Sequence, residues 1–82
     1  MNKKLKVYPL KIEDIIYPRK NFNEFYSQDE LLILVEKIKN GKEVTPIIVK
    51  FSSQGYEIVK GSIILEAYKL LHKKIIPAYI QR

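Results

Sequence analysis

The stretch 60-KGSIILEAYKLL-71 has the form of a loop that turns into a helix, and it decides how the rest of the chain is interpreted. Gly61 frees the backbone and Ser62 can cap, so we expect a helix over 63–72. Backbone N–H groups at such a junction can hold a phosphate. The first helical turn, however, carries three large apolar side chains where an anion site needs donors or positive charge: Ile63, Ile64 and Leu65. Three interpretations are open: a working anion site, a vestigial one, or plain core.

Length and composition narrow the possible functions. The 82 residues suit one domain, so we expect a single domain over 1–82. An apolar fraction of 46% with 29% charged residues is typical of a globular protein. The absence of cysteine excludes disulfides, thiolate nucleophiles and cysteine metal sites. No apolar run is long enough for a membrane span or a signal peptide, so we expect a cytoplasmic protein without a membrane partner.

The chain is basic, with a net charge of +6, which permits attraction to nucleic acid. Thirteen of the fifteen basic residues are lysines, and they are scattered along the chain, which favours a solvated surface over a nucleic-acid face. Nucleic acid stays open as a partner if the fold brings five of these residues near one edge: Arg19, Lys20, Lys60, Lys73 and Lys74.

The strongest local pattern is a helix over 28–40. Ser27 and Glu30 form a capping box, and Gly41 closes the helix. Four apolar residues fall on one stripe and should face the core: Leu31, Leu34, Val35 and Ile38. The aromatic residues just before this helix, Phe22, Phe25 and Tyr26, could stack on single-stranded nucleic acid, but packing against the helix is the favoured interpretation.

The remaining segments predict strands. We expect one over 5–10, at an edge or ended by Pro9, and an antiparallel hairpin of 45–51 with 56–60. A last short strand, "IIPAYI", contains Pro77, which indicates an edge position or an irregular ladder. Together these elements predict a small α/β (α+β) domain with a mixed sheet and two main helices.

The order of short motifs, "YPR", "TPIIV", "GYEIVKG", "EAYKLL" and "IPAYI", resembles the N-terminal domain of ParB-like proteins. That superfamily includes sulfiredoxin and ParB-like nucleases. The resemblance runs from about Val7 to Ile80. It implies a small α/β fold with a mixed sheet, and a nucleotide or phosphate site in the loop before the second helix.

The resemblance breaks at that loop. The family pattern keeps Gly61 and Glu66 but has a basic pair where this chain has Ile63 and Ile64. Arginine there would bond phosphate oxygens, whereas isoleucine offers no donor. The phosphate site is therefore expected to be vestigial, reduced to Gly61 and Ser62. Sulfiredoxin chemistry is excluded more firmly, because it needs a cysteine in this loop.

No residue of the chain is predicted to be catalytic, and no metal or cofactor is expected. The single histidine, His72, should cap the second helix or lie exposed. Glu66 should pair with Lys69, three residues on.

These observations favour a non-catalytic ParB-like binding module, associated with DNA or with a regulatory protein, that has lost its phosphate site. If Ile63, Ile64 and Leu65 reach the surface, they form a patch for a protein partner or for a homo-oligomer. The alternative is a ParB-like nucleotide-binding domain or nuclease with residual phosphate binding.

Overall fold

A computed structural model describes residues 6–18 and 24–82 of the chain. In chain order the elements are β1 (Val7–Lys11), the 3-10 turn η1 (Ile12–Asp14), β2 (Ile15–Ile16), α1 (Gln28–Lys39), β3 (Ile47–Ser52), β4 (Gly55–Lys60), α2 (Ser62–Leu70) and β5 (Ile75–Gln81). The strands form one five-stranded sheet in the order β1-β5-β3-β4-β2. The predicted α/β class with a mixed sheet and two main helices is confirmed.

The sheet combines both kinds of strand pairing. β3 and β4 form the predicted antiparallel hairpin, and β1 pairs antiparallel with β5, whereas β5 lies parallel to β3 and β2 parallel to β4. Pro9 lies on the edge strand β1, as predicted. Pro77 lies on β5, which is not an edge strand, but the pairing of β5 with β3 begins at Ala78, so Pro77 itself is paired on the β1 side alone. The register sets Pro77 opposite Pro9, so both residues without an N–H share one position of the ladder.

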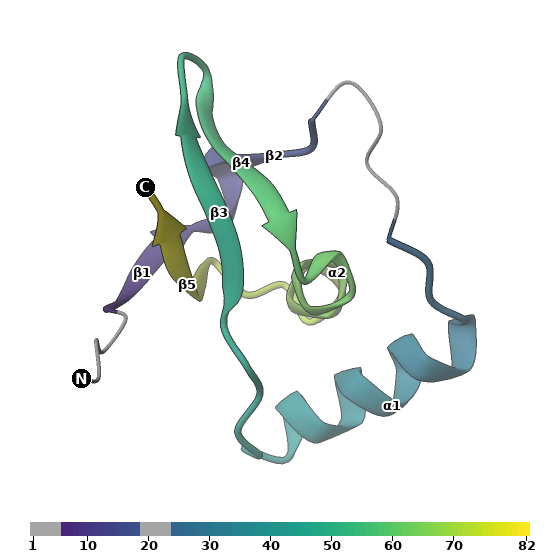
Figure 1. Cartoon of the computed structure of the whole chain (residues 1–82). Coiled ribbons are helices and arrows are strands. Elements are labelled where there is room, and N and C mark those ends of the chain that lie inside the picture. Colours follow the sequence, from purple (N-terminus) through teal and green to yellow (C-terminus); the bar gives the residue numbers. More distant parts are fainter. Residues whose placement is uncertain (1–5, 19–23) are drawn as a thin grey trace, which may run out of the picture.

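The molecule is built in three layers: the sheet, then α2, then α1 (Figure 1). The larger core lies between the sheet and α2, where alternate strand residues such as Ile47, Val49, Ile58 and Ile76 meet Leu65. A second, smaller cluster joins α1 to α2 through Leu31, Ile38 and Ala67. Tyr68 packs against both clusters, so α2 is the element that connects α1 to the sheet.

The predicted helix over 28–40 is confirmed to within one residue. Ser27 accepts a hydrogen bond from the Glu30 N–H, and the Glu30 side chain accepts one from Ser27, so both halves of the capping box are present. The predicted apolar stripe faces the second cluster, with Leu31 and Ile38 buried and Leu34 and Val35 packed beside them.

The predicted packing of the aromatic residues before α1 is wrong for Phe25, which is 91% exposed. Tyr26 is 37% exposed, and Phe22 lies outside the described residues. The chain therefore enters α1 with the Phe25 ring in solvent, and the capping box marks the start of the helix.

Candidate anion site at the start of α2

The turn from β4 into α2 depends on Gly61. Its backbone is left-handed, with φ of +101°, a conformation that side chains with a Cβ rarely adopt. A Cβ here would also lie 3.0 Å from the Ile47 Cγ2 atom and 3.3 Å from the Ile47 Cα atom. Close packing on β3 and the left-handed turn thus both select glycine, and the turn presents its N–H groups outward from the sheet.

A carboxylate of the chain itself occupies these N–H groups. The Gly61 N–H donates to both oxygens of Glu24, each at 3.0 Å, and the Ser62 N–H donates to Glu24 Oε1 at 2.6 Å. These are the donors that a helix N-terminus offers to a phosphate. Glu24 lies 37 residues before Gly61 in the sequence, so the fold brings an internal anion into the position expected for an external one.

The electrostatics of Glu24 are those of a held anion. Partial burial by itself would raise the pKa of this carboxyl, but the hydrogen bonds from the Ser62 and Gly61 N–H groups and the nearby charge of Lys60 outweigh it and lower the pKa. Glu24 is therefore ionised at neutral pH, and its negative charge compensates the positive end of α2.

Ser62 adds a second polar group at the same place. Its residue is only 3% exposed, and its side chain lies close enough to Glu24 to help lower the pKa of that carboxyl. Ser62 lines a small pocket of about 200 Å³ together with Glu24, Phe25, Tyr26 and Ile63. The hydroxyl and the two N–H groups thus face the same carboxylate, as the donors of an anion site do.

The three apolar residues of the first turn of α2 have different environments. Leu65 is fully buried in the larger core, so the prediction that it joins a surface patch is wrong. Ile64 packs against the same core, and Ile63 packs against the cluster that joins α1 to α2. Both are half-buried. The helix turns its apolar side chains towards the sheet and α1, so only parts of Ile63 and Ile64 remain accessible.

In the sequence, Tyr17 precedes and Glu24 follows the segment 19–23, and the side chains of both form hydrogen bonds with α2. The Tyr17 hydroxyl donates a hydrogen bond to Glu66 Oε2, and the Lys69 Nζ atom lies 5.2 Å from the centre of the Tyr17 ring. The predicted ion pair is present, with 3.7 Å between Lys69 Nζ and Glu66 Oε2. Burial, then the hydrogen bond and charge of Glu66, raise the pKa of Tyr17 above its ordinary value, so the phenol remains a donor. Glu66 is thereby engaged as a structural acceptor.

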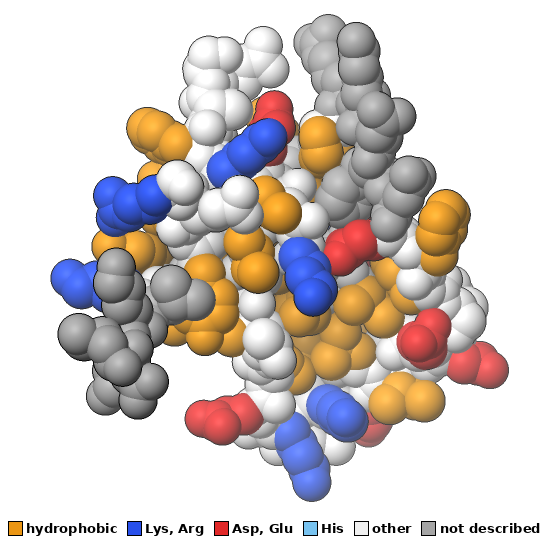
Figure 2. Space-filling view, viewed as in Figure 1, with side chains coloured by type: hydrophobic (Ala, Val, Ile, Leu, Met, Phe, Trp, Pro, Cys, Tyr) orange, Lys and Arg blue, Asp and Glu red, His pale blue; other side chains and the backbone are white. Residues whose placement is uncertain are grey.

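The three described basic residues of the group proposed for nucleic acid do not gather at one place. Lys60 precedes α2, whereas Lys73 and Lys74 follow it, so the length of a nine-residue helix, roughly 13 Å, separates them. Figure 2 shows lysine and arginine side chains spread over the visible face. Lys11 lies close to Lys73 and Lys74, because it pairs with Ile75, the residue that follows them. Arg19 and Lys20 lie outside the described residues.

The remaining candidates have simple environments. His72 is exposed just beyond α2, with a left-handed backbone, and its N–H donates to the Lys69 carbonyl. Across residues 6–18 and 24–82, acidic and histidine side chains form no group of three that could hold a metal ion. None of the helices in that part of the chain has the length and apolar character needed to cross a bilayer.

A comparison with family models matches the ParB N-terminal domain over residues 1–82. The chain belongs to the ParB N-terminal domain family. A comparison with curated proteins finds no match. The resemblance noted from the sequence motifs is thus confirmed over the whole length of the chain.

Solved structures share the fold of this ParB-like domain. It superposes on sulfiredoxin from Arabidopsis thaliana with a TM-score of 0.76 and 23% identity, covering 94% of this chain and 85% of that one. ParB from Caulobacter crescentus complexed with CTP-gamma-S gives a TM-score of 0.80 and 20% identity, with 94% of this chain and 44% of that chain covered. A free serine kinase in complex with AMP gives 0.76 and 20%, with 96% and 32% covered. The domain therefore spans less than half of the ParB and kinase chains.

Sequence reasoning found Gly61 and Ser62 but missed Glu24. Glu24 has no local pattern that marks it, since it belongs to no helix or strand and its partners are 37 and 38 residues away. The only available signal was the composition of the turn itself. A helix start without basic side chains still exposes N–H donors, and such donors need an acceptor from somewhere in the chain or from solvent.

Proposed function

We propose that this ParB-like domain is a non-catalytic binding module whose phosphate site is filled by its own Glu24 carboxylate. The observation that carries the proposal is the set of hydrogen bonds from the Gly61 and Ser62 N–H groups to that carboxylate. An external phosphate would need the same donors, so it would have to displace an anion already ionised and in place.

The side chains around the turn support the loss of catalysis. This chain has Ile63 and Ile64 where the family pattern has a basic pair. Both isoleucines pack against the hydrophobic clusters. They supply no charge to a phosphoryl group. Glu66, the acidic residue nearest in sequence, already accepts from Tyr17 and pairs with Lys69. The first turn of α2 thus offers backbone N–H donors to an anion but carries no basic side chain that could stabilise a leaving group.

The alternative, residual phosphate binding, is favoured by one observation. The Ser62 hydroxyl is buried beside Glu24, and its side chain helps to lower the pKa of that carboxyl. If Glu24 moves away, this hydroxyl and two N–H groups could hold a phosphate weakly. The two functions differ in whether the resting domain binds a phosphate or only a variant without Glu24 does so.

The partners proposed for the module are nucleic acid or another protein, and we place its action in the cytoplasm. Support comes from the net charge of +6 and from the family, in which one ParB structure is complexed to the centromeric parS site. Exposed apolar side chains on the outer surface of α1, Leu32 at 53% and Ile33 at 60%, are available for a protein partner.

The test follows the amide signals of Gly61 and Ser62 by NMR while CTP or inorganic phosphate is added at millimolar concentration. We expect no shift in the unmodified domain. Glu24→Ala should free the two N–H groups, so that phosphate shifts the same amides and saturates weakly. Glu43→Ala is the matched control, because Glu43 is an exposed carboxylate in the loop after α1.

A saturable shift of the Gly61 and Ser62 signals in the unmodified domain would contradict the proposal and select residual phosphate binding. Equal affinity for phosphate in the unmodified domain and in Glu24→Ala would show that Glu24 does not compete with the ligand. Either result is independent of the partner that the module binds elsewhere on its surface.

A further inference from the structure

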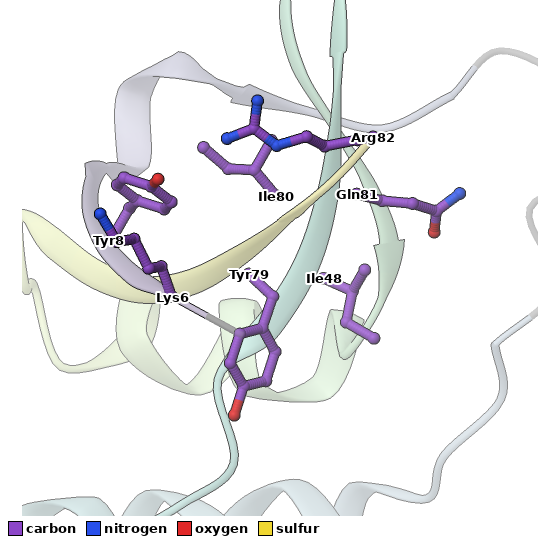
Figure 3. Close-up of a pocket in the computed structure, with 7 residues that line it drawn as sticks. All are labelled: Lys6, Tyr8, Ile48, Tyr79, Ile80, Gln81 and Arg82. Atoms are coloured by element: carbon purple, nitrogen blue, oxygen red, sulfur yellow. The ribbon is translucent and has the colours of Figure 1, made fainter. Parts of the chain in front are cut away.

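A groove lies at the end of β5, at the opposite end of β4 from the Gly61 turn. Figure 3 shows its main part, a cavity of about 600 Å³. Tyr79 and Ile48 lie on one side of β5, and the Tyr8 ring, Ile80 and the Arg82 guanidinium lie on the other. A second hollow shares Ile80, Gln81 and Arg82 with the first and continues to Phe51 and Tyr56. The two hollows meet at these three residues and are together called the β5 groove.

The groove exists because the two neighbours of β5 end at different points. The described pairing of β1 with β5 stops at Val7 and Tyr79, whereas β3 follows β5 as far as Lys50 and Gln81. Ile80 and Gln81 consequently have a strand partner on one side only in the described pairing. Lys6, just before β1, and Arg82, just after β5, stand at the open side.

Aromatic rings mark both ends of the β5 groove. At one end Tyr8 is half-buried on the side of β5 that also carries Ile80 and Arg82, whereas Tyr79 lies on the other side. At the other end, Phe51 is 74% exposed, and its ring centre lies 5.1 Å from that of Tyr56, with the two planes tilted by 43°. Exposure of a phenylalanine to this degree gives no stability to the core, so the ring is available to a ligand.

The charges of the groove have one sign. Its lining includes Lys6 and Arg82 and no carboxylate side chain. The acidic residue of the adjoining strand pair, Glu57, is 3.9 Å from Lys50 Nζ and so has a cation of its own. A flexible anion with flat apolar groups matches this lining better than an apolar peptide does.

We infer that the β5 groove binds single-stranded nucleic acid, with bases stacked on Phe51 and Tyr8 and phosphates held by Arg82 and Lys6. Exposed rings at intervals along a cationic groove are the arrangement that binds single strands without reading sequence. Duplex nucleic acid fits less well, because its bases are already stacked and cannot reach the Phe51 ring. The site differs from the predicted group of Lys60, Lys73 and Lys74, and it does not depend on whether Glu24 fills the turn before α2.

The test measures fluorescence anisotropy of a labelled oligothymidine of about ten nucleotides, a usual site size, at low salt. Phe51→Ala should weaken binding at least about fivefold, since base stacking on an aromatic ring typically accounts for more than that. Arg82→Ala should weaken binding and reduce the slope of log K against log salt by about 0.7, the value for one phosphate contact on a single strand.

Two matched controls separate the groove from the general surface. Leu32→Ala removes an exposed apolar side chain from α1, 53% exposed against 74% for Phe51, and Lys39→Ala removes an exposed charge from the end of the same helix. Neither should change the affinity by more than about twofold, because neither touches the groove. Glu24→Gln should likewise have no effect, which keeps this result distinct from the proposed closure of the phosphate site.

Three results would overturn the inference. The first is no rise in anisotropy at low salt. The second is an equal loss in Phe51→Ala and Leu32→Ala. The third is a map of NMR shifts that centres on Lys73 and Lys74 instead of residues 80–82.

Discussion

At the scale of single residues, Glu24 makes the stability of the domain depend on pH. Hydrogen bonds and the charge of Lys60 lower the pKa of its carboxyl in the folded state. A lowered pKa adds stability above the pKa of the unfolded chain, and this stability is lost as the pH falls through the folded pKa. Unfolding of the protein should therefore become easier below the ordinary glutamate pKa of 4.5.

Glu24→Gln measures that contribution. The amide can accept from one N–H group but carries no charge, so we expect a loss of about 1 kcal/mol in the free energy of unfolding at pH 7. The difference from the unmodified domain should shrink as the pH falls towards 3, because the carboxyl becomes neutral as well. Urea unfolding at several pH values gives both quantities. Glu43→Gln, at an exposed position, should change neither; a pH-independent difference for Glu24→Gln would exclude a charge effect.

At the scale of secondary-structure elements, the start of α1 is set by the capping box of Ser27 and Glu30. The residue before it, Tyr26, is more than a third exposed, so the reciprocal hydrogen bonds between Ser27 and Glu30 fix the first turn. Ser27→Ala should lower the free energy of unfolding by about 1 kcal/mol. Ser53→Ala, in the exposed turn between β3 and β4, is the control for thermal melting. Equal melting temperatures for the two variants would contradict this role of the cap.

The elements differ in how far the sequence predicts them, and the reason is the range of the interactions that form them. α1 carries its cap, its stripe and its closing glycine within its own residues, so its bounds follow from local rules. β2 has only two residues and exists because it pairs with β4, about forty residues later, so no local pattern reveals it. The position of the strand that contains Pro77 could not be predicted for the same reason, because the order of strands in a sheet depends on contacts between distant segments.

The candidate site follows the same division. The glycine of the turn and the apolar first turn of α2 are visible in the stretch around Gly61, because both are local requirements of a strand-to-helix turn. The face of α2 that Leu65 occupies depends on where the sheet lies, and the acceptor Glu24 arrives from a distant segment. The burial of Leu65 and the hydrogen bonds to Glu24 therefore could not be predicted from the local sequence.

At the scale of the whole molecule, the two hydrophobic clusters imply two units of stability. Among residues 6–18 and 24–82, α1 contributes to the smaller cluster and not to the larger one. A segment held by fewer buried side chains opens at lower free energy than the rest. α1 should therefore exchange its amide hydrogens through a partial opening in which the sheet and the larger core remain folded, with rates faster than those of β3 and β5.

Two variants distinguish this partial opening from global unfolding. Leu31→Ala weakens the smaller cluster. It destabilises the native state relative to the form in which only α1 is open and relative to the unfolded chain, so exchange should accelerate in α1 and in the sheet. Val49→Ala costs about 2 kcal/mol in the larger cluster, which is intact when only α1 opens. Its effect should therefore appear in β3 and β5 but not in α1. Native-state hydrogen exchange by NMR resolves the two, and an equal acceleration of α1 and β5 in Val49→Ala would mean that the domain opens only as one cooperative unit.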